Sequence, residues 1–126
     1  MEGVEVDEKL LEAFHLMYDH FPEPVMLSHK SRLVMAANPV CVKMGRKPGM
    51  ICAKLGTGLI HKGCQAAKTV AEHKAVYKMA GARNAWGEDF ISFWLPIDGY
   101  PDFYVHFAVG STVNYKDTPA GIKVDK

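Results

Sequence analysis

The stretch Leu33-Val34-Met35-Ala36-Ala37-Asn38-Pro39 combines the end of a predicted strand with the start of a helix. An apolar run over residues 32–36 follows another over residues 25–29, and the polar residues between them predict a hairpin turn. Asn is a preferred N-cap and Pro is favoured at the first helical position. Asn38-Pro39 therefore predicts a two-turn helix over residues 39–44, which Gly45 ends with a left-handed residue.

The residues before this hairpin predict an amphipathic helix over residues 8–20. Asp7 is placed as its N-cap, and Pro22 and Pro24 prevent it from continuing. Its apolar stripe is large enough to pack on the domain, on a second copy of the chain, or on both. The candidate dimer contacts on this stripe are Leu10, Leu11, Phe14, Met17 and Tyr18.

The second half of the chain predicts a further helix and more strands. A helix is expected from residue 64 to about residue 72. Residues 73–80 fit either its continuation or a turn and a strand, because hydrophobic period alone does not separate the two. Residues 90–97 and 103–112 are rich in aromatic and branched side chains and predict two strands. Residues 115–126 are interpreted as a tail or the start of a linker.

This order of elements resembles the PAS family of sensory domains over residues 22–114. Asn38-Pro39 and Gly45-Arg46 are similar to the family's motifs around the first short helix. Residues 64–70 followed by His73-Lys74-Ala75-Val76 are similar to its helix and turn, although the usual turn Gly is absent. The resemblance favours a strand after residue 74. It implies an α+β fold, a five-stranded antiparallel sheet with short helices on one face, preceded by the helix of residues 1–21.

The resemblance also implies a non-catalytic role. Such a module binds a small molecule or a signalling protein and passes a conformational bias to a neighbouring element, and we expect it to form a homodimer. On the last strand, His106 is expected to share a face with Tyr104 and Ala108, either lining a pocket or facing a helix. The candidate pocket residues are Met35, Met44, Ile51, Leu55, Val70, Tyr77, Trp94 and His106.

A haem-based gas or redox sensor is the main alternative. In the haem-binding branch of the family the iron-binding His precedes the turn after the long helix, and His61 stands near that offset. His73 is a second candidate if the helix continues, because it would then share an apolar face with Val70 and Tyr77. A third hypothesis is a ligand-free dimerisation module. The flavin-binding signature around a reactive Cys is absent from the sequence.

The distribution of charge argues against other classes of protein. Fifteen Lys and Arg balance fourteen Asp and Glu in 126 residues, but residues 24–83 hold eleven of the bases and only one acid, Glu72. This middle segment therefore offers no paired carboxylates for hydrolysis or for a hard metal. Tyr77 is the only aromatic residue between Lys30 and Arg83, so the segment has no stacking platform for nucleic acid.

Residues 1–23 carry the opposite charge, with seven acids and one base. The segregation makes electrostatic docking of the first helix on its own or a partner's middle segment plausible. The longest stretch without Asp, Glu, Lys, Arg or His, residues 33–42, is too short to span a membrane. An odd number of cysteines without paired spacing is typical of free thiols, so we expect a cytoplasmic domain. These cysteines are Cys41, Cys52 and Cys64.

Overall fold

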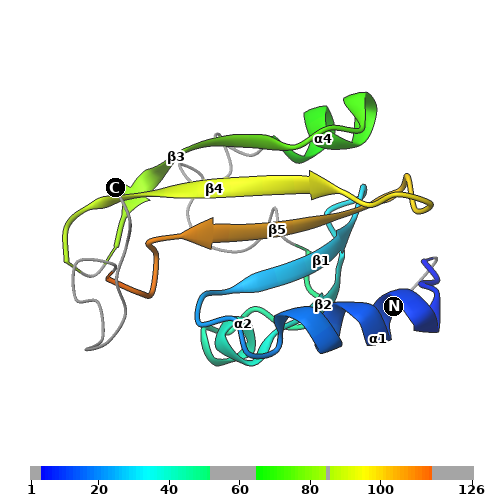
Figure 1. Ribbon diagram of the computed structural model, residues 1–126, viewed down its shortest axis with the longest axis horizontal. Coiled ribbons are helices and arrows are strands. Elements are labelled where there is room, and N and C mark those ends of the chain that lie inside the picture. Colours follow the sequence, from blue (N-terminus) through cyan, green and yellow to red (C-terminus); the bar gives the residue numbers. More distant parts are fainter. Residues whose placement is uncertain (1–3, 52–64, 85, 115–126) are drawn as a thin grey trace.

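The alternating apolar runs of the sequence form five antiparallel strands in the computed structural model, which describes residues 4–51, 65–84 and 86–114 (Figure 1). The strands follow the order β2-β1-β5-β4-β3 across the sheet, so the last strand of the chain lies at its centre. The α+β fold predicted from the sequence is confirmed. The elements are α1 (Glu8–Tyr18), β1 (Val25–His29), β2 (Val34–Ala37), α2 (Pro39–Lys43), α4 (Ala66–Glu72), β3 (Val76–Arg83), β4 (Asp89–Pro96) and β5 (Phe103–Val109).

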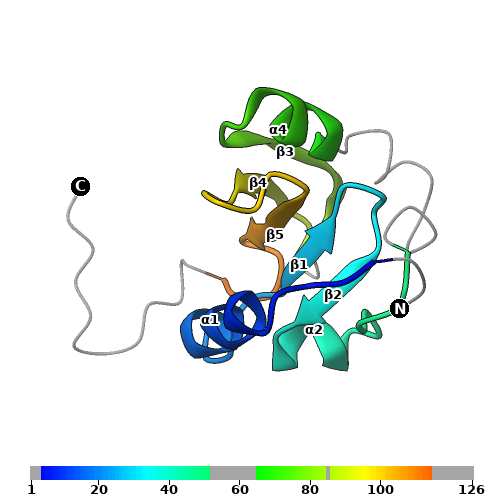
Figure 2. The ribbon, with the colours of Figure 1, turned by 90° about the vertical axis from the view of Figure 1, so that its right-hand side faces the viewer.

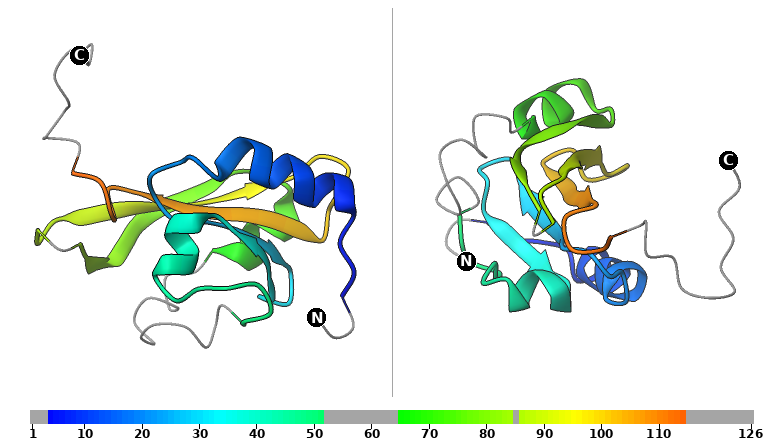
Figure 3. Two further views of the ribbon diagram at one scale, coloured as in Figure 1. Left: turned by 90° about the horizontal axis from the view of Figure 1, so that it is seen from below. Right: turned by 90° about the vertical axis from the view of Figure 1, so that its left-hand side faces the viewer.

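The helices lie on both faces of the sheet. Figures 2 and 3 show α1 on one face and α2 on the other, and the core clusters agree with this arrangement. Leu10 and Phe14 of α1 pack against Val25 and Leu27, whereas Cys41 of α2 packs against the alternate residue Met26. Helix α4 packs on the same face as α2, because its Ala66 clusters with Trp94 and Tyr104. We call the two surfaces the α1 face and the α2–α4 face.

Both predicted helix caps are confirmed. The Asp7 carboxylate accepts a hydrogen bond from Lys9 N at 2.9 Å, and α1 ends at Tyr18, two residues before the predicted end. The Asn38 side chain accepts from Cys41 N at 3.1 Å, with Pro39 at the first position of α2. None of the helices in the described ranges is long and apolar enough to cross a bilayer.

The ambiguity after residue 72 is resolved as a turn followed by a strand. His73 adopts a left-handed conformation with φ of 47°, which ends α4 at Glu72. The chain then reverses and Val76 pairs with Trp94 on β4. The helical alternative for residues 73–80 is therefore wrong.

A bulge between β1 and β2 places one predicted pocket residue on the opposite face of the sheet. Leu27 pairs with Ala36 and Ser28 with Val34, so Met35 is the extra residue of β2. Met35 consequently belongs to the cluster of Leu10 and Phe14 on the α1 face. Its assignment to the same pocket as Trp94 and His106 is wrong, because strict alternation along the strand does not allow for the extra residue.

Candidate functional site

The centre of the α2–α4 face is a row of paired residues that crosses all five strands. Trp94 of β4 pairs with His106 of β5, which pairs with Met26 of β1. Residues directly opposite one another in antiparallel strands share a face. The indole and imidazole rings are stacked, with centroids 4.7 Å apart and planes inclined by 16°. The prediction that His106 shares a face with Tyr104 and Ala108 is confirmed, as all three alternate along β5.

Helix α4 holds one side of this row in place. Ala66 is buried against Trp94 and Tyr104, and Val70 packs half-buried on the same cluster. The buried Thr69 hydroxyl lies 2.9 Å from Trp94 O and 2.6 Å from Lys74 O and donates to these carbonyls. This contact connects α4 to the backbone of β4 and to the turn that precedes β3.

The buried polar atoms on this face include one on Ser28 and one on Trp94 that have no hydrogen-bond partner in the part of the chain that the structure describes. They are the hydroxyl Oγ of Ser28 and the indole Nε1 of Trp94, and the Trp94 residue is only 3% exposed. Ser28 pairs with Tyr104 in the row next to that of Trp94. An unsatisfied buried donor costs about 1–3 kcal/mol, so such groups are normally paired with water or a bound molecule. The arrangement can therefore donate hydrogen bonds to an acceptor.

The other predicted pocket residues do not join this row. Tyr77 pairs with Phe93, which lies on the α1 face, and the Tyr77 side chain is 69% exposed. Met44 and Ile51 are exposed near α2, and Leu55 lies outside the described residues. Of the eight candidates, the structure brings Val70, Trp94 and His106 together. Ser28 was not predicted, although a lone polar residue in the apolar run of β1 was a usable signal.

One of the two predicted iron ligands, His73, lies in the described part of the chain but not beside these rings. His73 is exposed at the end of α4, with Nε2 2.9 Å from Asp98 Oδ1, so its placement on an apolar helix face is wrong. His61 lies outside the described residues. Among the described residues, no group of three His, Cys, Asp or Glu side chains is placed to hold a metal ion.

The α1 face carries a second candidate surface, which is apolar. Phe107 of β5 stacks on Phe93 of β4, with ring centroids 5.0 Å apart. The Phe21 ring lies 6.0 Å from that of Phe107, and the Tyr77 ring lies 5.7 Å from that of Phe93, again between centroids. A cleft of about 240 Å³ separates α1 from the end of β4. Its walls include Ala13 and Met17 of α1, Leu95 of β4 and Ile97, which directly follows β4.

The predicted dimer stripe on α1 is partly buried in its own chain. Leu10 and Phe14 belong to the core, with Phe14 only 2% exposed, so their assignment to an intermolecular contact is wrong. Leu11 and Tyr18 are half-buried on the same cluster. Met17 is 63% exposed and remains available to a partner.

The start of α1 is held to the β4–β5 connection by a hydrogen bond. Tyr100 Oη donates to the Asp7 carboxylate at 2.9 Å. The pKa of Asp7 is lowered, first by the Lys9 backbone N–H and then by this hydroxyl. The same bond to an anion raises the pKa of Tyr100 above its ordinary value. Asp7 therefore both caps α1 and positions it over the sheet.

The strand order, the α2–α4 face and the helix capped by Asn38 together define the fold of a PAS domain. No protein-family model matches the sequence, and no curated protein matches it. The fold is shared with the LOV protein of Rhodobacter sphaeroides, at 19% sequence identity and a TM-score of 0.51, over 82% of this chain and 68% of that one.

Two further solved structures share the fold over most of their length. The PAS domain of Bordetella pertussis BvgS is 13% identical, with a TM-score of 0.51, over 81% of this chain and 82% of that chain. A domain of the sensory box sensor histidine kinase/response regulator from Geobacter sulfurreducens is 12% identical, with a TM-score of 0.52, over 84% and 98% of the two chains. At these identities the likeness establishes the fold of this chain.

Proposed function

We propose that this chain is a sensory module that binds a small molecule on its α2–α4 face and relays the binding to a neighbouring segment or protein. The observation that carries the proposal is the pair of buried polar atoms, Ser28 Oγ and Trp94 Nε1. The solved structures with this fold include sensory proteins, which supports a sensory role.

The two atoms limit the kind of ligand. Ser28 and Trp94 lie on the two strands that flank β5 and in neighbouring rows, which places their backbones roughly 12 Å apart from strand spacing and residue rise. A flat molecule of one or two rings spans that distance. The indole N–H is a hydrogen-bond donor and cannot accept. The ligand must therefore present a hydrogen-bond acceptor to Trp94. The role we propose is binding rather than catalysis.

The test is a titration followed by the indole N–H resonances in nitrogen–proton NMR spectra. The probes are benzoate, picolinate and uracil, which combine a flat ring with three different acceptors, and Trp86→Phe assigns the Trp94 signal. We expect at least one probe to shift the Trp94 resonance saturably and Ser28→Ala to weaken its binding. If no probe shifts Trp94 at millimolar concentration, the proposal is contradicted.

The haem alternative stays a prediction that concerns His61 alone. Its test is the visible absorption spectrum of the protein with and without added haemin. A Soret band that is lost in His61→Ala would favour haem over the hydrogen-bonded ligand. A spectrum that stays that of free haemin when the protein is present would exclude it.

We also propose that the chain forms a homodimer through its α1 face. Met17 is exposed and lines the cleft between α1 and the end of β4. Figure 2 shows no described element over β3 and β4 on this face. A two-fold axis parallel to the strands would place α1 of each copy over β3 of its partner. Each copy would then contribute both its exposed α1 surface and its cleft to the interface.

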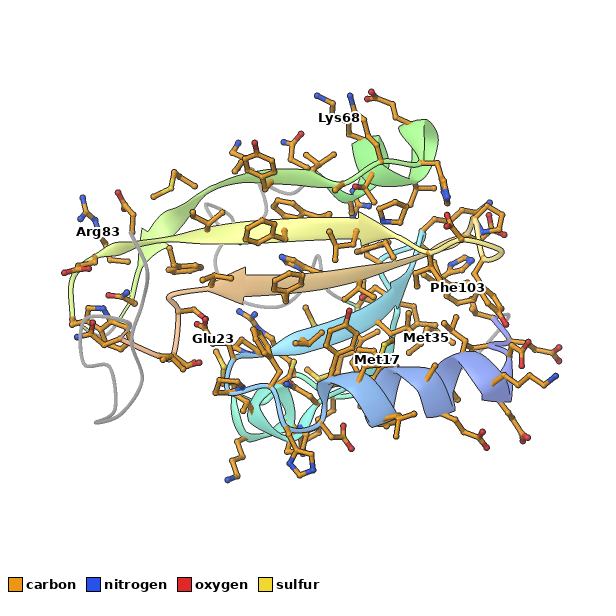
Figure 4. The ribbon with its side chains drawn as sticks, viewed as in Figure 1. Met17, Glu23, Met35, Lys68, Arg83 and Phe103 are labelled. Carbon is orange, nitrogen blue, oxygen red and sulfur yellow. The ribbon has the colours of Figure 1, made fainter. Side chains whose placement is uncertain are left out.

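Charge supports this pairing. Residues 4–19 hold five carboxylates and one Lys, whereas residues 65–83 hold four Lys and Arg and one Glu. Figure 4 shows Lys68 on α4 and Arg83 on β3 at the side of the molecule opposite α1. The proposed arrangement therefore brings an acidic edge against a basic edge, and added salt is expected to weaken the dimer.

Light scattering after size exclusion tests the dimer on the full chain, since α1 contributes Phe14 to the core and cannot be deleted without damage. We expect Met17→Glu to give a monomer and Met44→Glu, the same change beside α2, to leave the dimer intact. A wild-type monomer at tens of micromolar would contradict the proposal, and so would a dimer of Met17→Glu.

A further inference from the structure

The Glu23 side chain is a carboxylate buried at 0% exposure beside the end of β5 (Figure 4). It lies between Pro22 and Pro24, two residues before the start of β1. Its oxygens accept hydrogen bonds from the backbone N–H groups of Gly110 at 2.8 Å, Ser111 at 2.6 Å and Thr112 at 2.9 Å. The Ser111 hydroxyl donates a further bond at 3.1 Å.

Three successive backbone N–H groups directed at one carboxylate form an anion-binding nest. Gly110 permits the required turn, because its φ of 94° lies in the left-handed region. Burial of a carboxylate is costly unless hydrogen bonds replace its water, and charge-assisted bonds to N–H groups do so. The contact therefore joins the segment that leads into β1 to the segment that follows β5, 87 residues later in the chain.

The same junction continues to α1 and α2. Thr112 Oγ1 also donates a hydrogen bond to the carbonyl oxygen of Pro22, the residue before Glu23, at 3.0 Å. Glu23 O accepts from Asn38 Nδ2 at 2.8 Å, and that amide also contacts Tyr18 O at the end of α1. Asn38 is the N-cap of α2, so one polar network connects two helices and the exit from β5.

We propose that Glu23 is a latch that fixes the direction in which the chain leaves β5 and couples this exit to the N-cap of α2. The inference rests on the proposed function, since it names the route by which a change on the α2–α4 face reaches the segment after β5. Loss of the carboxylate charge releases residues 110–112 while the sheet remains folded, because β5 is held separately by its ladders with β1 and β4.

The test is amide hydrogen exchange of the full chain without ligand, measured by NMR. Glu23→Gln keeps the shape of the side chain but turns an N–H donor toward the nest. We expect exchange at residues 110–112 to accelerate by about tenfold or more, while the β5 amides of Val105 and Phe107 change by less than about threefold. The Asn38 side-chain amide signals should shift in the same variant, which reports the coupling to α2.

The matched control is Glu12→Gln, the same change at an exposed position of α1. It should leave exchange at residues 110–112 and the Asn38 signals unchanged. Ser111→Ala removes only the hydroxyl donor and serves if Glu23→Gln fails to fold; it should accelerate residues 110–112 by about threefold without affecting β5.

Equal acceleration at residues 110–112 and in β5 would overturn the latch, since Glu23 would then only contribute to global stability. No acceleration in the variant that folds would also overturn it, and so would unshifted Asn38 signals. These outcomes are distinct from failure of the proposed function, which would appear as unshifted Trp94 resonances in the probe titration.

Discussion

Replacing Asn38 by Ala removes a fully buried amide that several segments share. Its Oδ1 accepts from Val25 N at 2.9 Å and from Cys41 N at 3.1 Å, and its Nδ2 donates to Glu23 O at 2.8 Å. Loss of the α2 cap costs about 1 kcal/mol. The Val25 N–H and the Glu23 carbonyl are each left buried without this partner, at about 1–2 kcal/mol each. We therefore expect a destabilisation of about 3–5 kcal/mol, a large part of the total stability of a domain of this size.

Urea unfolding at 25 °C, followed by tryptophan fluorescence and circular dichroism, measures this loss as a difference in the free energy of unfolding. The matched control is Asp7→Ala, which removes the exposed cap of α1 and should cost clearly less than Asn38→Ala. If Asn38→Ala costs no more than Asp7→Ala, the buried network contributes nothing beyond capping and the reasoning is refuted.

Three other changes follow from the same structure. Phe14→Ala should lower the free energy of unfolding by about 3–5 kcal/mol, whereas Leu16→Ala, on the exposed side of α1, should change it by less than about 0.5 kcal/mol; similar losses would contradict the packing of α1. The pKa of Asp7 is lower in the folded chain than in the unfolded one, so the charged carboxylate stabilises the fold above about pH 4. This contribution is lost as the pH falls through the pKa that Asp7 has in the folded chain. The stability difference between wild type and Asp7→Asn should therefore shrink in acid, and the pKa of Tyr100, followed by ultraviolet titration, should fall in that variant; an unchanged Tyr100 would count against the contact. Gly110→Ala places a side chain at a φ of 94°, so it should cost about 1–3 kcal/mol in urea unfolding, and a neutral effect would contradict the nest geometry.

Local chemistry made much of the fold predictable. Asn38-Pro39 specifies the start of α2 through a side-chain cap and the fixed φ of proline. Asp7 specifies the start of α1 through its side-chain cap. The shared face of Tyr104, His106 and Ala108 follows from alternation along β5. These features depend on residues a few positions apart, which a pattern in the sequence records.

The features that the sequence did not reveal depend on distant partners or on one inserted residue. The bulge beside Met35 shifts that residue to the α1 face, and no local pattern distinguishes it from a regular strand. His73 ends α4 only because it adopts the left-handed conformation, which the sequence permits without requiring. Glu23 resembles any acidic residue of a loop until the turn of residues 110–112 is placed against it.

The measurement that tests the central claim most directly is the NMR titration of the Trp94 indole with benzoate, picolinate and uracil. The account predicts a saturable shift of the Trp94 resonance with at least one of these acceptors, and weaker binding of that probe to Ser28→Ala. A Trp94 resonance that none of the three probes moves at millimolar concentration would contradict a ligand site on the α2–α4 face.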